Sequence, residues 1–173
     1  MIGLLTAQTK TLVLLFEPQP IKLYPINLMQ ADFTQKELED NVIFVKSYFI
    51  TLIIFLGLDF LWLGLVAREF YASQLNTLVR EDINYLAAGF FYLLYVGGIV
   101  YFVVSPALAE ADWRKAAING LLLGVIAYAT YDMTNMATLK NWPVLITFVD
   151  IAWGGLLTCL SGVFGYLIIR ALP

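Results

Sequence analysis

The sequence contains no histidine and only one cysteine, and these shortages exclude several kinds of site. Without histidine there is no His-ligated haem or zinc, and no catalytic triad that depends on an imidazole. The lone Cys159 cannot form a disulfide within the chain, and its apolar sequence surroundings indicate a buried, inert thiol. We therefore expect neither a cofactor nor a metal centre.

Charge is also scarce, since charged residues make up 13% of the 173 residues and soluble proteins have about a quarter. The sequence has no basic block and no alternation of basic and aromatic residues, so a nucleic-acid partner is not expected. Hydrophobic residues reach 61%, and the few charges cluster so that long apolar stretches lie between them. Because about 20 mostly apolar residues cross a bilayer, this pattern predicts an integral membrane protein.

Four apolar stretches are long enough to span a membrane, namely Ser47–Ala67, Tyr85–Val104, Ala116–Ala137 and Val144–Ile169. Short connections place successive helices side by side, so we predict an all-α bundle of four transmembrane helices in up-down-up-down order. The first connection has apolar residues at near-helical spacing, which predicts a short interfacial helix, with a soluble loop as the alternative. These apolar residues are Phe70, Tyr71, Leu75, Leu78 and Val79.

Residues 1–41 differ from the rest of the chain. Their apolar run is short and interrupted by polar residues, and three prolines follow it, which favour an extended backbone. Thr34 and Glu37 have the spacing of a capping box for a short helix that leads to the first span. We interpret residues 1–41 as an N-terminal leader that is disordered, mis-assigned upstream of the true start, or interfacial. Residues 42–173 then form the transmembrane domain.

Three of the predicted spans carry an aspartate, although a carboxylate at mid-membrane costs about 2.5–3.5 kcal/mol on insertion scales. They are Asp59, Asp132 and Asp150. With a helical rise of about 1.5 Å per residue, all three fall in the same half of the bilayer. Such a cluster suits acid–base chemistry, a proton path or polar binding, and structural hydrogen bonding between helices is the alternative.

Aromatic and polar residues fall at the same depth as these acids. Tyr128 and Tyr131 join the three aspartates as candidate catalytic residues. The pattern Asp-x-x-Trp occurs at Asp59 and again at Asp150, and helical spacing puts each acid and its indole on one face. The plainer interpretation is that such residues bond neighbouring helices, at about 0.6 kcal/mol each. The expected lining of a cup that opens to one side of the membrane is Trp62, Tyr92, Tyr95, Asn135 and Trp153.

The opposite half of the bilayer is expected to be tightly packed. Small residues follow one face of the third span and recur on the fourth, and such stripes let helices approach closely or pair between chains. We expect helix packing, and an available homo-oligomer contact, at Gly120, Gly124, Ser161 and Gly165.

Several runs of the sequence resemble a bacterial membrane family catalogued as domain of unknown function 2177. They are Asp59–Gly64, Tyr131–Leu139 with its string Tyr-Asp-x-Thr-Asn-x-Ala-Thr-Leu, Trp142-Pro143 and Asp150–Gly154. The resemblance covers about Lys46 to the C-terminus. It implies a membrane protein of this fold, and it supplies no catalytic residue.

The sequence leaves three functions open, and whether the protein is an enzyme stays undecided. One hypothesis is a protein that acts on or binds a lipid or another apolar small molecule through the acid and tyrosine cluster. The alternatives are a proton- or cation-coupled transporter, or a subunit of one, and a non-catalytic binding or scaffold module. A hard cation bridging the three carboxylates is a minor variant of these hypotheses.

Basic residues near the ends of the spans predict an orientation. Four lie on the side where the first span begins and three on the other side. The positive-inside rule then predicts a multi-pass inner-membrane protein with both termini in the cytoplasm, the cup opening outward, and membrane lipids as its partners. The two groups are Lys46, Arg114, Lys115 and Arg170, and Arg68, Arg80 and Lys140.

Overall fold

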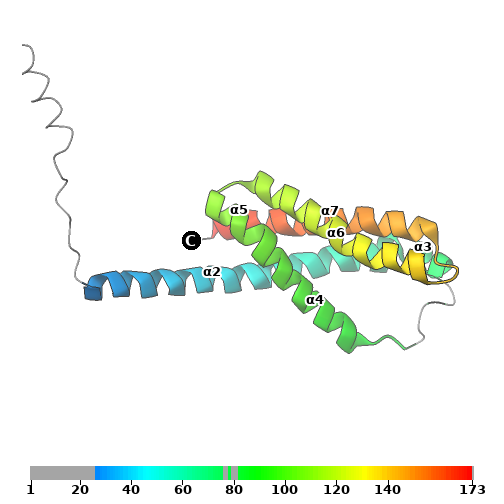
Figure 1. The fold of residues 1–173 in the computed structure, drawn as a ribbon, viewed down its shortest axis with the longest axis horizontal. Coiled ribbons are helices and arrows are strands. Elements are labelled where there is room, and N and C mark those ends of the chain that lie inside the picture. The colour runs from blue at the N-terminus through cyan, green and yellow to red at the C-terminus, as the bar shows by residue number, and fades with distance from the viewer. Residues whose placement is uncertain (1–25, 76–77, 79–81, 173) are drawn as a thin grey trace, which may run out of the picture. The chain divides into compact units, whose positions relative to one another are not determined.

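The computed structural model describes residues 26–75, 78 and 82–172, and every regular element among them is a helix. The elements are α2 (Ile26–Leu61) with a π-helical turn (Trp62–Val66), α3 (Arg68–Leu75), α4 (Tyr85–Ile99) with a second π-helical turn (Val100–Val104), α5 (Ser105–Glu110), α6 (Trp113–Thr138) and α7 (Val144–Ala171). Contacts divide the chain into two units, residues 1–38 and 39–173. The packing described below is that of the second unit (Figure 1).

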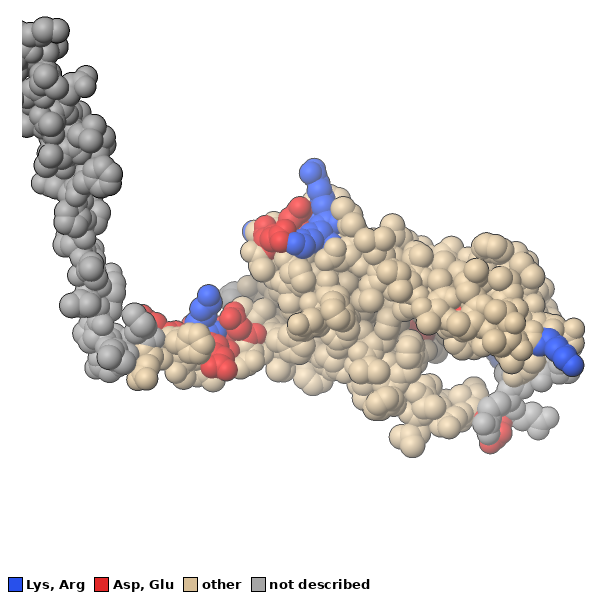
Figure 2. Space-filling model, viewed as in Figure 1, with Lys and Arg blue, Asp and Glu red and all other residues tan. Residues whose placement is uncertain are grey.

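Among the described residues, four helical segments are long and apolar enough to cross a membrane, which confirms the all-α fold with four candidate spans. They are Asp32–Val66, Tyr85–Glu110, Trp113–Thr138 and Val144–Ala171. Figure 2 shows a mostly uncharged face over α4, α6 and α7, with charged side chains on the N-terminal part of α2 and near the ends of other helices. The alternating orientation of the spans across a membrane stays a prediction.

α6 and α7 lie side by side along most of their length because both helices carry glycine at the contact (Figure 1). A Cβ atom added to Gly120 would lie 2.8 Å from the Cα of Cys159, and one added to Gly124 would overlap the carbonyl group of Gly154. Later residues of α6 therefore contact earlier residues of α7, so the two helices are antiparallel. The small-residue face of α6 is buried within this chain.

α2 meets its neighbours through larger side chains. Phe55 is fully buried, and its ring packs edge-on against the rings of Tyr92 and Tyr95 on α4, with centroids 5.8 and 5.6 Å away. Nearby, a Cβ on Gly165 of α7 would lie 2.6 Å from the Thr51 hydroxyl oxygen of α2. Gly165 therefore packs between helices, and Ser161 one turn earlier is buried as well.

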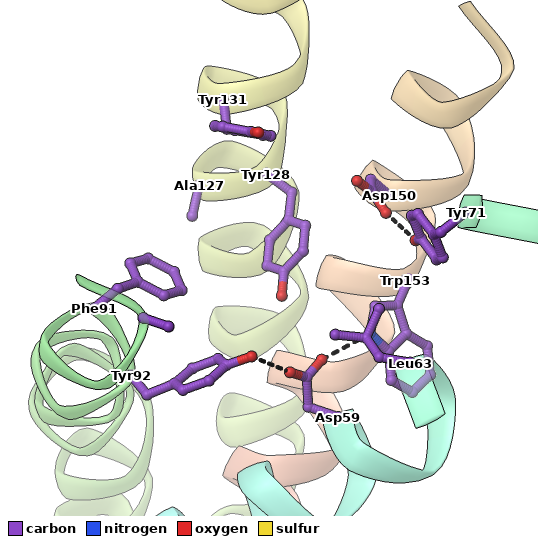
Figure 3. A pocket seen from close by; sticks show the side chains of 11 residues that line it. Asp59, Leu63, Tyr71, Phe91, Tyr92, Ala127, Tyr128, Tyr131, Asp150 and Trp153 are labelled. Atoms are coloured by element: carbon purple, nitrogen blue, oxygen red, sulfur yellow. Dashed lines mark hydrogen bonds between the residues drawn. The ribbon is translucent and has the colours of Figure 1, made fainter. Parts of the chain in front are cut away.

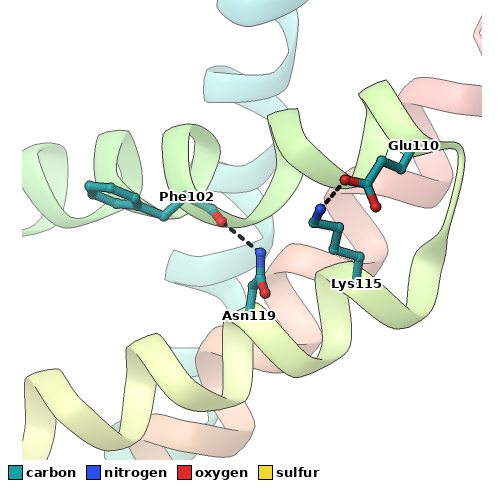
Figure 4. Close-up of polar contacts among 4 residues, drawn as sticks. All are labelled: Phe102, Glu110, Lys115 and Asn119. Atoms are coloured by element: carbon teal, nitrogen blue, oxygen red, sulfur yellow. Dashed lines mark hydrogen bonds and ion pairs between the residues drawn. The ribbon is translucent and has the colours of Figure 1, made fainter.

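A proline explains the irregular end of the second span. Pro106 has no backbone N–H for the carbonyl of Phe102, four residues earlier, and its ring crowds that carbonyl. The preceding turn, Val100–Val104, is widened to a π-helix. The side chain of Asn119 on α6 supplies a donor instead, since its Nδ2 lies 3.1 Å from the Phe102 carbonyl oxygen (Figure 4).

The turn between α5 and α6 is fixed by local contacts. Ala111 adopts a left-handed conformation, with φ of 54°, and ends α5. Asp112 then caps α6, because its side chain accepts a hydrogen bond of 2.9 Å from the backbone N–H of Arg114. Lys115 pairs with Glu110 across the turn (Figure 4). These contacts hold the start of α6 beside the end of the second span.

The first long helix differs from the sequence prediction. The Thr34 hydroxyl donates to the carbonyl of Gln30 at 2.9 Å, so Thr34 lies inside a helix and the predicted capping box is wrong. The described part of this helix runs from Ile26 to Leu61, so Thr34 lies well inside it. Residues 1–25 lie outside the described residues, and the division into a leader and a transmembrane domain stays a prediction.

The first connection contains the predicted short helix, α3, which confirms that it is not a featureless loop. Phe70, Tyr71 and Leu75 belong to it, Leu78 lies beyond its end, and Val79 is outside the described residues. Its location in a membrane interface stays a prediction.

Candidate functional site

A cavity of about 380 Å³ lies between α2, α3, α4, α6 and α7. Its wall is mostly apolar, and two carboxylates and four tyrosine rings interrupt it (Figure 3). The lining residues are Asp59, Leu63, Tyr71, Ala88, Phe91, Tyr92, Ala127, Tyr128, Tyr131, Asp150 and Trp153. The lining includes one residue of α3, Tyr71, and six candidates from the sequence, which are Asp59, Tyr92, Tyr128, Tyr131, Asp150 and Trp153.

Asp59 is the more deeply buried of the two carboxylates, with 5% of its surface exposed. The Tyr92 hydroxyl of α4 donates to its Oδ2 at 2.7 Å, and the indole Nε1 of Trp153 on α7 lies 3.4 Å from its Oδ1 (Figure 3). Both oxygens thus receive a donor from a different helix. Asp59 therefore links α2, α4 and α7 at the floor of the cavity.

Asp150 lies on α7, on another side of the cavity. The Tyr71 hydroxyl of α3 donates to its Oδ1 (Figure 3), and the Trp62 Nε1 lies 3.3 Å from that hydroxyl. Burial, and then the hydrogen bond to Asp150, raise the pKa of Tyr71 above its ordinary value, although the Trp62 hydrogen bond opposes this change. Tyr71 is therefore a neutral donor at physiological pH.

The π-helical turn at the end of the first span shapes this region. The backbone N–H of Ala67 donates to the carbonyl of Trp62 at 2.7 Å, which closes a wider ring than an α-helical turn. The turn begins three residues after Asp59, and it carries both Trp62 and the lining residue Leu63. π-Helical turns are rare and often occur at functional sites.

Two tyrosines of α6 complete the wall. The ring of Tyr128 lies against Gly154, where a Cβ atom would overlap it, so only glycine allows the ring to lie there. Its hydroxyl points into the space between Asp59 and Asp150 (Figure 3). Tyr131, one turn further along α6, also lines the cavity, and its ring centroid lies 6.0 Å from that of Trp142.

The third candidate acid is separate from the cavity. Asp132 is fully buried, it is not among the lining residues, and neither of its oxygens has a hydrogen-bond partner among the described residues. The three aspartates predicted from the sequence thus divide into two that face the cavity and one buried behind it.

Three other residues expected in the lining occupy different places. Trp62 stacks on Trp153, with ring centroids 4.4 Å apart, and so supports the wall from behind. Tyr95 is buried, and its hydroxyl shares a 2.8 Å hydrogen bond with Thr158. Asn135, half-buried on α6, is not among the lining residues either.

Tyr71 is the polar lining residue that sequence reasoning missed, because it was counted only as part of an interfacial helix. The available signal was a hydroxyl on the apolar face of a short helix between two Asp-x-x-Trp runs. Gly154 was also missed, and its signal was its place directly after Trp153 at the level of the cavity. Neither signal specifies a partner without the fold.

Two carboxylates and several phenols in an apolar wall offer hydrogen-bond acceptors and weak acids. Within the described part of the chain, no three His, Cys, Asp or Glu side chains come together in a way that could hold a metal ion. The suggested bridging of three carboxylates by a hard cation is therefore not formed. The arrangement suits a polar group that donates hydrogen bonds to Asp59 and Asp150.

A family model described as a predicted membrane protein (DUF2177) matches residues 44–167. No curated protein and no solved structure matches the sequence. The family match includes parts of all four candidate spans and every residue that lines the cavity. The chain therefore belongs to the DUF2177 family of predicted membrane proteins.

Proposed function

We propose that this protein binds an amphipathic molecule, a lipid or another apolar compound, whose polar head enters the cavity and donates hydrogen bonds to Asp59 and Asp150. The observation that carries this proposal is a pair of carboxylates in an otherwise apolar cavity that lies among four membrane-spanning candidates. Ligand pockets are commonly apolar cavities of about 300–1,000 Å³ with a few polar groups that orient the ligand.

The charge of the lining restricts the head group. The described lining residues include two aspartates and no lysine or arginine. A phosphate or carboxylate head would meet like charge there without a compensating cation, which costs free energy in a low dielectric. A neutral head with hydroxyl groups, or a positively charged amine, would instead supply the donors that carboxylate oxygens accept.

The same geometry supports acid–base chemistry on the bound molecule. Asp150 is half-buried in the wall, and the hydroxyl of Tyr128 points into the space between the two acids (Figure 3). A carboxylate in an apolar site can serve as a general base and a phenol as a proton donor. A bound molecule that changes with time supports an enzyme, and one that stays unchanged supports a binding or scaffold module.

Native mass spectrometry of the purified protein tests the proposal. Wild-type protein is expected to retain a neutral or cationic amphiphile that Asp59→Asn and Asp150→Asn lose. Asp40→Asn is the matched control, because Asp40 is exposed and does not line the cavity. Equal retention by all four proteins would overturn the proposal, and an anionic lipid bound through the cavity would overturn its head-group chemistry.

A second candidate function is proton-coupled transport, and Asp132 favours it. Carboxylates inside membranes often mark proton relays, and Asp132 is a buried carboxyl group without a hydrogen-bond partner among the described residues. Asp150 lines the cavity, so a relay from Asp132 to the ligand would pass a proton between these two acids. Asp150 would then connect the buried acid with the ligand.

Proteoliposomes with an imposed pH gradient test this second candidate. Flux of protons, or of a bound amphiphile, should depend on the gradient and should fall at least tenfold in Asp132→Asn, while Asp40→Asn transports like wild type. An unchanged flux in Asp132→Asn would rule out the relay through this residue.

We also propose an inner-membrane location with both termini in the cytoplasm. The support is the small excess of basic residues on the terminal side of the spans. Single cysteines in a Cys159→Ser background test it, because a membrane-impermeant reagent should label a cysteine at Ser73 from outside the cell. Labelling there only after the membrane is opened would reverse the orientation.

A further inference from the structure

A second hollow lies next to the cavity, on α4. It is an open groove of about 470 Å³ between α4 and α6, and its wall is apolar or aromatic throughout. The residues that carry the argument are Phe91, Leu94, Tyr95, Gly98, Phe102 and Leu123. All of them belong to helical segments that are candidates for membrane spans.

The groove and the cavity share a wall. Phe91 lines both hollows, and its ring stacks on that of Tyr95 with centroids 5.4 Å apart. On α6 the groove ends at Leu123, and the cavity begins at Ala127, one turn further along the same face. The cavity and the groove therefore adjoin each other at Phe91 and along α6.

The cavity and the groove differ in polarity in the same way as the head and the tail of an amphiphile. The cavity has both carboxylates, and the described lining of the groove has no charged residue. The Tyr95 hydroxyl, one of the few polar groups near the groove, is already bonded to Thr158. Tyr101 adds a second hydroxyl to the lining, and the other lining residues are apolar. The groove therefore offers mainly dispersion contacts, which suits a hydrocarbon tail.

We infer that the groove holds the tail of the molecule whose head lies in the cavity, so the ligand is a long-chain amphiphile with a neutral or cationic, hydrogen-bond-donating head. This inference rests on the proposed function. The rival occupant is the tail of an unrelated bilayer lipid, which would fill the groove whether or not the cavity is occupied.

Substitution of a glycine that lines the groove can fill the groove without disturbing the fold. A Cβ atom on Gly98 would meet nothing within 4 Å, so a leucine there can extend into the groove. Gly57 on α2 is the matched control, because its Cβ would also meet nothing within 4 Å and it lines neither hollow. Gly98→Leu and Gly57→Leu should therefore unfold at similar temperatures.

The experiment uses two probes, octylamine and hexadecylamine, the second also in a form with a photoactivatable diazirine in its tail. Wild-type protein should bind both, and the diazirine should react with α4 residues of the groove. Gly98→Leu should lose these adducts and bind hexadecylamine roughly tenfold more weakly. It should bind octylamine as Gly57→Leu does.

The Asp59→Asn variant distinguishes between the two possible occupants of the groove. If the tail belongs to the molecule in the cavity, this variant loses binding of both probes and the groove adducts together. Groove adducts that persist in Asp59→Asn, or that are equal in Gly98→Leu and Gly57→Leu, would overturn the inference and leave the proposed function standing. Failure of wild type to bind octylamine would overturn the proposed function, and the inference with it.

Discussion

The indole rings of Trp62 and Trp153 lie face to face, with centroids 4.4 Å apart and planes inclined by 10°. Each indole N–H is directed, either to the acid itself or through Tyr71, at the carboxylate of the Asp-x-x-Trp motif that contains the other ring. Trp153 lies within 3.4 Å of Asp59, and Trp62 donates to the Tyr71 hydroxyl that in turn donates to Asp150. The two Asp-x-x-Trp motifs are thus joined by an exchange of donors.

This exchange follows from the way α2 and α7 meet. Thr51 lies beside Gly165 and Asp59 beside Trp153, so the two helices run in opposite directions past each other. Within one motif the acid and the indole are one helical turn apart on the same face. Placing two such faces together in antiparallel fashion puts the indole of each motif near the acid of the other.

The first prediction concerns the stacked pair. A double-mutant cycle of Trp62→Leu and Trp153→Leu should give a coupling of about 0.5–1.5 kcal/mol in the free energy of unfolding, measured in detergent micelles. As a control, Trp113→Leu with Trp153→Leu should be additive within about 0.5 kcal/mol, since Trp113 is exposed at the start of α6. Additivity in both pairs would mean that the stack contributes nothing beyond burial.

Much of the fold was predictable because membrane spans are read from length and polarity alone. Asp59 and Asp150 were expected at one level of the bundle because a helix advances by a constant rise, and both line the cavity. Rotation about each helix axis was not. Asp132 shares a helix face with Tyr128, and yet Tyr128 lines the cavity while Asp132 is buried behind it.

The missed residues depend on contacts that no single segment reveals. Tyr71 reaches Asp150 only because the π-helical turn after Asp59 and the short α3 carry the chain back toward α7. The spacing of Thr34 and Glu37 suits a helix cap, whereas the described helix already includes the residues from Ile26 onward. A local capping signal cannot tell a helix start from a helix interior.

A second prediction concerns Tyr71. Tyr71→Phe removes the hydrogen bond between α3 and Asp150, and should lower the free energy of unfolding by about 1–3 kcal/mol. The pKa of Tyr71 is raised in the folded state above its ordinary value of 10.0. The stabilisation is therefore complete at pH values below 10.0 and is lost as the pH rises above that value. The measurement is unfolding of both proteins from neutral to alkaline pH.

The control for this titration is Tyr85→Phe, because Tyr85 is 77% exposed and outside the cavity. It should change the free energy of unfolding by less than about 0.5 kcal/mol at any pH. A Tyr71→Phe protein as stable as Tyr85→Phe would show that the contact with Asp150 does not hold α3.

A third prediction tests the α6–α7 contact. Gly124→Ala would place a methyl group on the carbonyl of Gly154, and a backbone atom cannot move aside as a side chain can. We expect a loss of about 3 kcal/mol or more in the free energy of unfolding. Gly57→Ala should instead be neutral or stabilising by up to about 1 kcal/mol, since its methyl group meets nothing within 4 Å. Similar effects at both positions would mean that the helices are not in close contact at Gly124.

The last prediction tests the account of the second π-helical turn. If Asn119 donates to the Phe102 carbonyl because Pro106 cannot, then Asn119→Leu should cost about 1 kcal/mol in the wild-type chain. In a Pro106→Ala background the helix regains a backbone N–H for that carbonyl, so the same substitution should cost much less. The measurement is a double-mutant cycle of unfolding free energies, with Ile118→Leu as a control because Ile118 is exposed on the same helix. An equal cost of Asn119→Leu in both backgrounds would mean that the asparagine stabilises the helix pair for a reason unrelated to the proline.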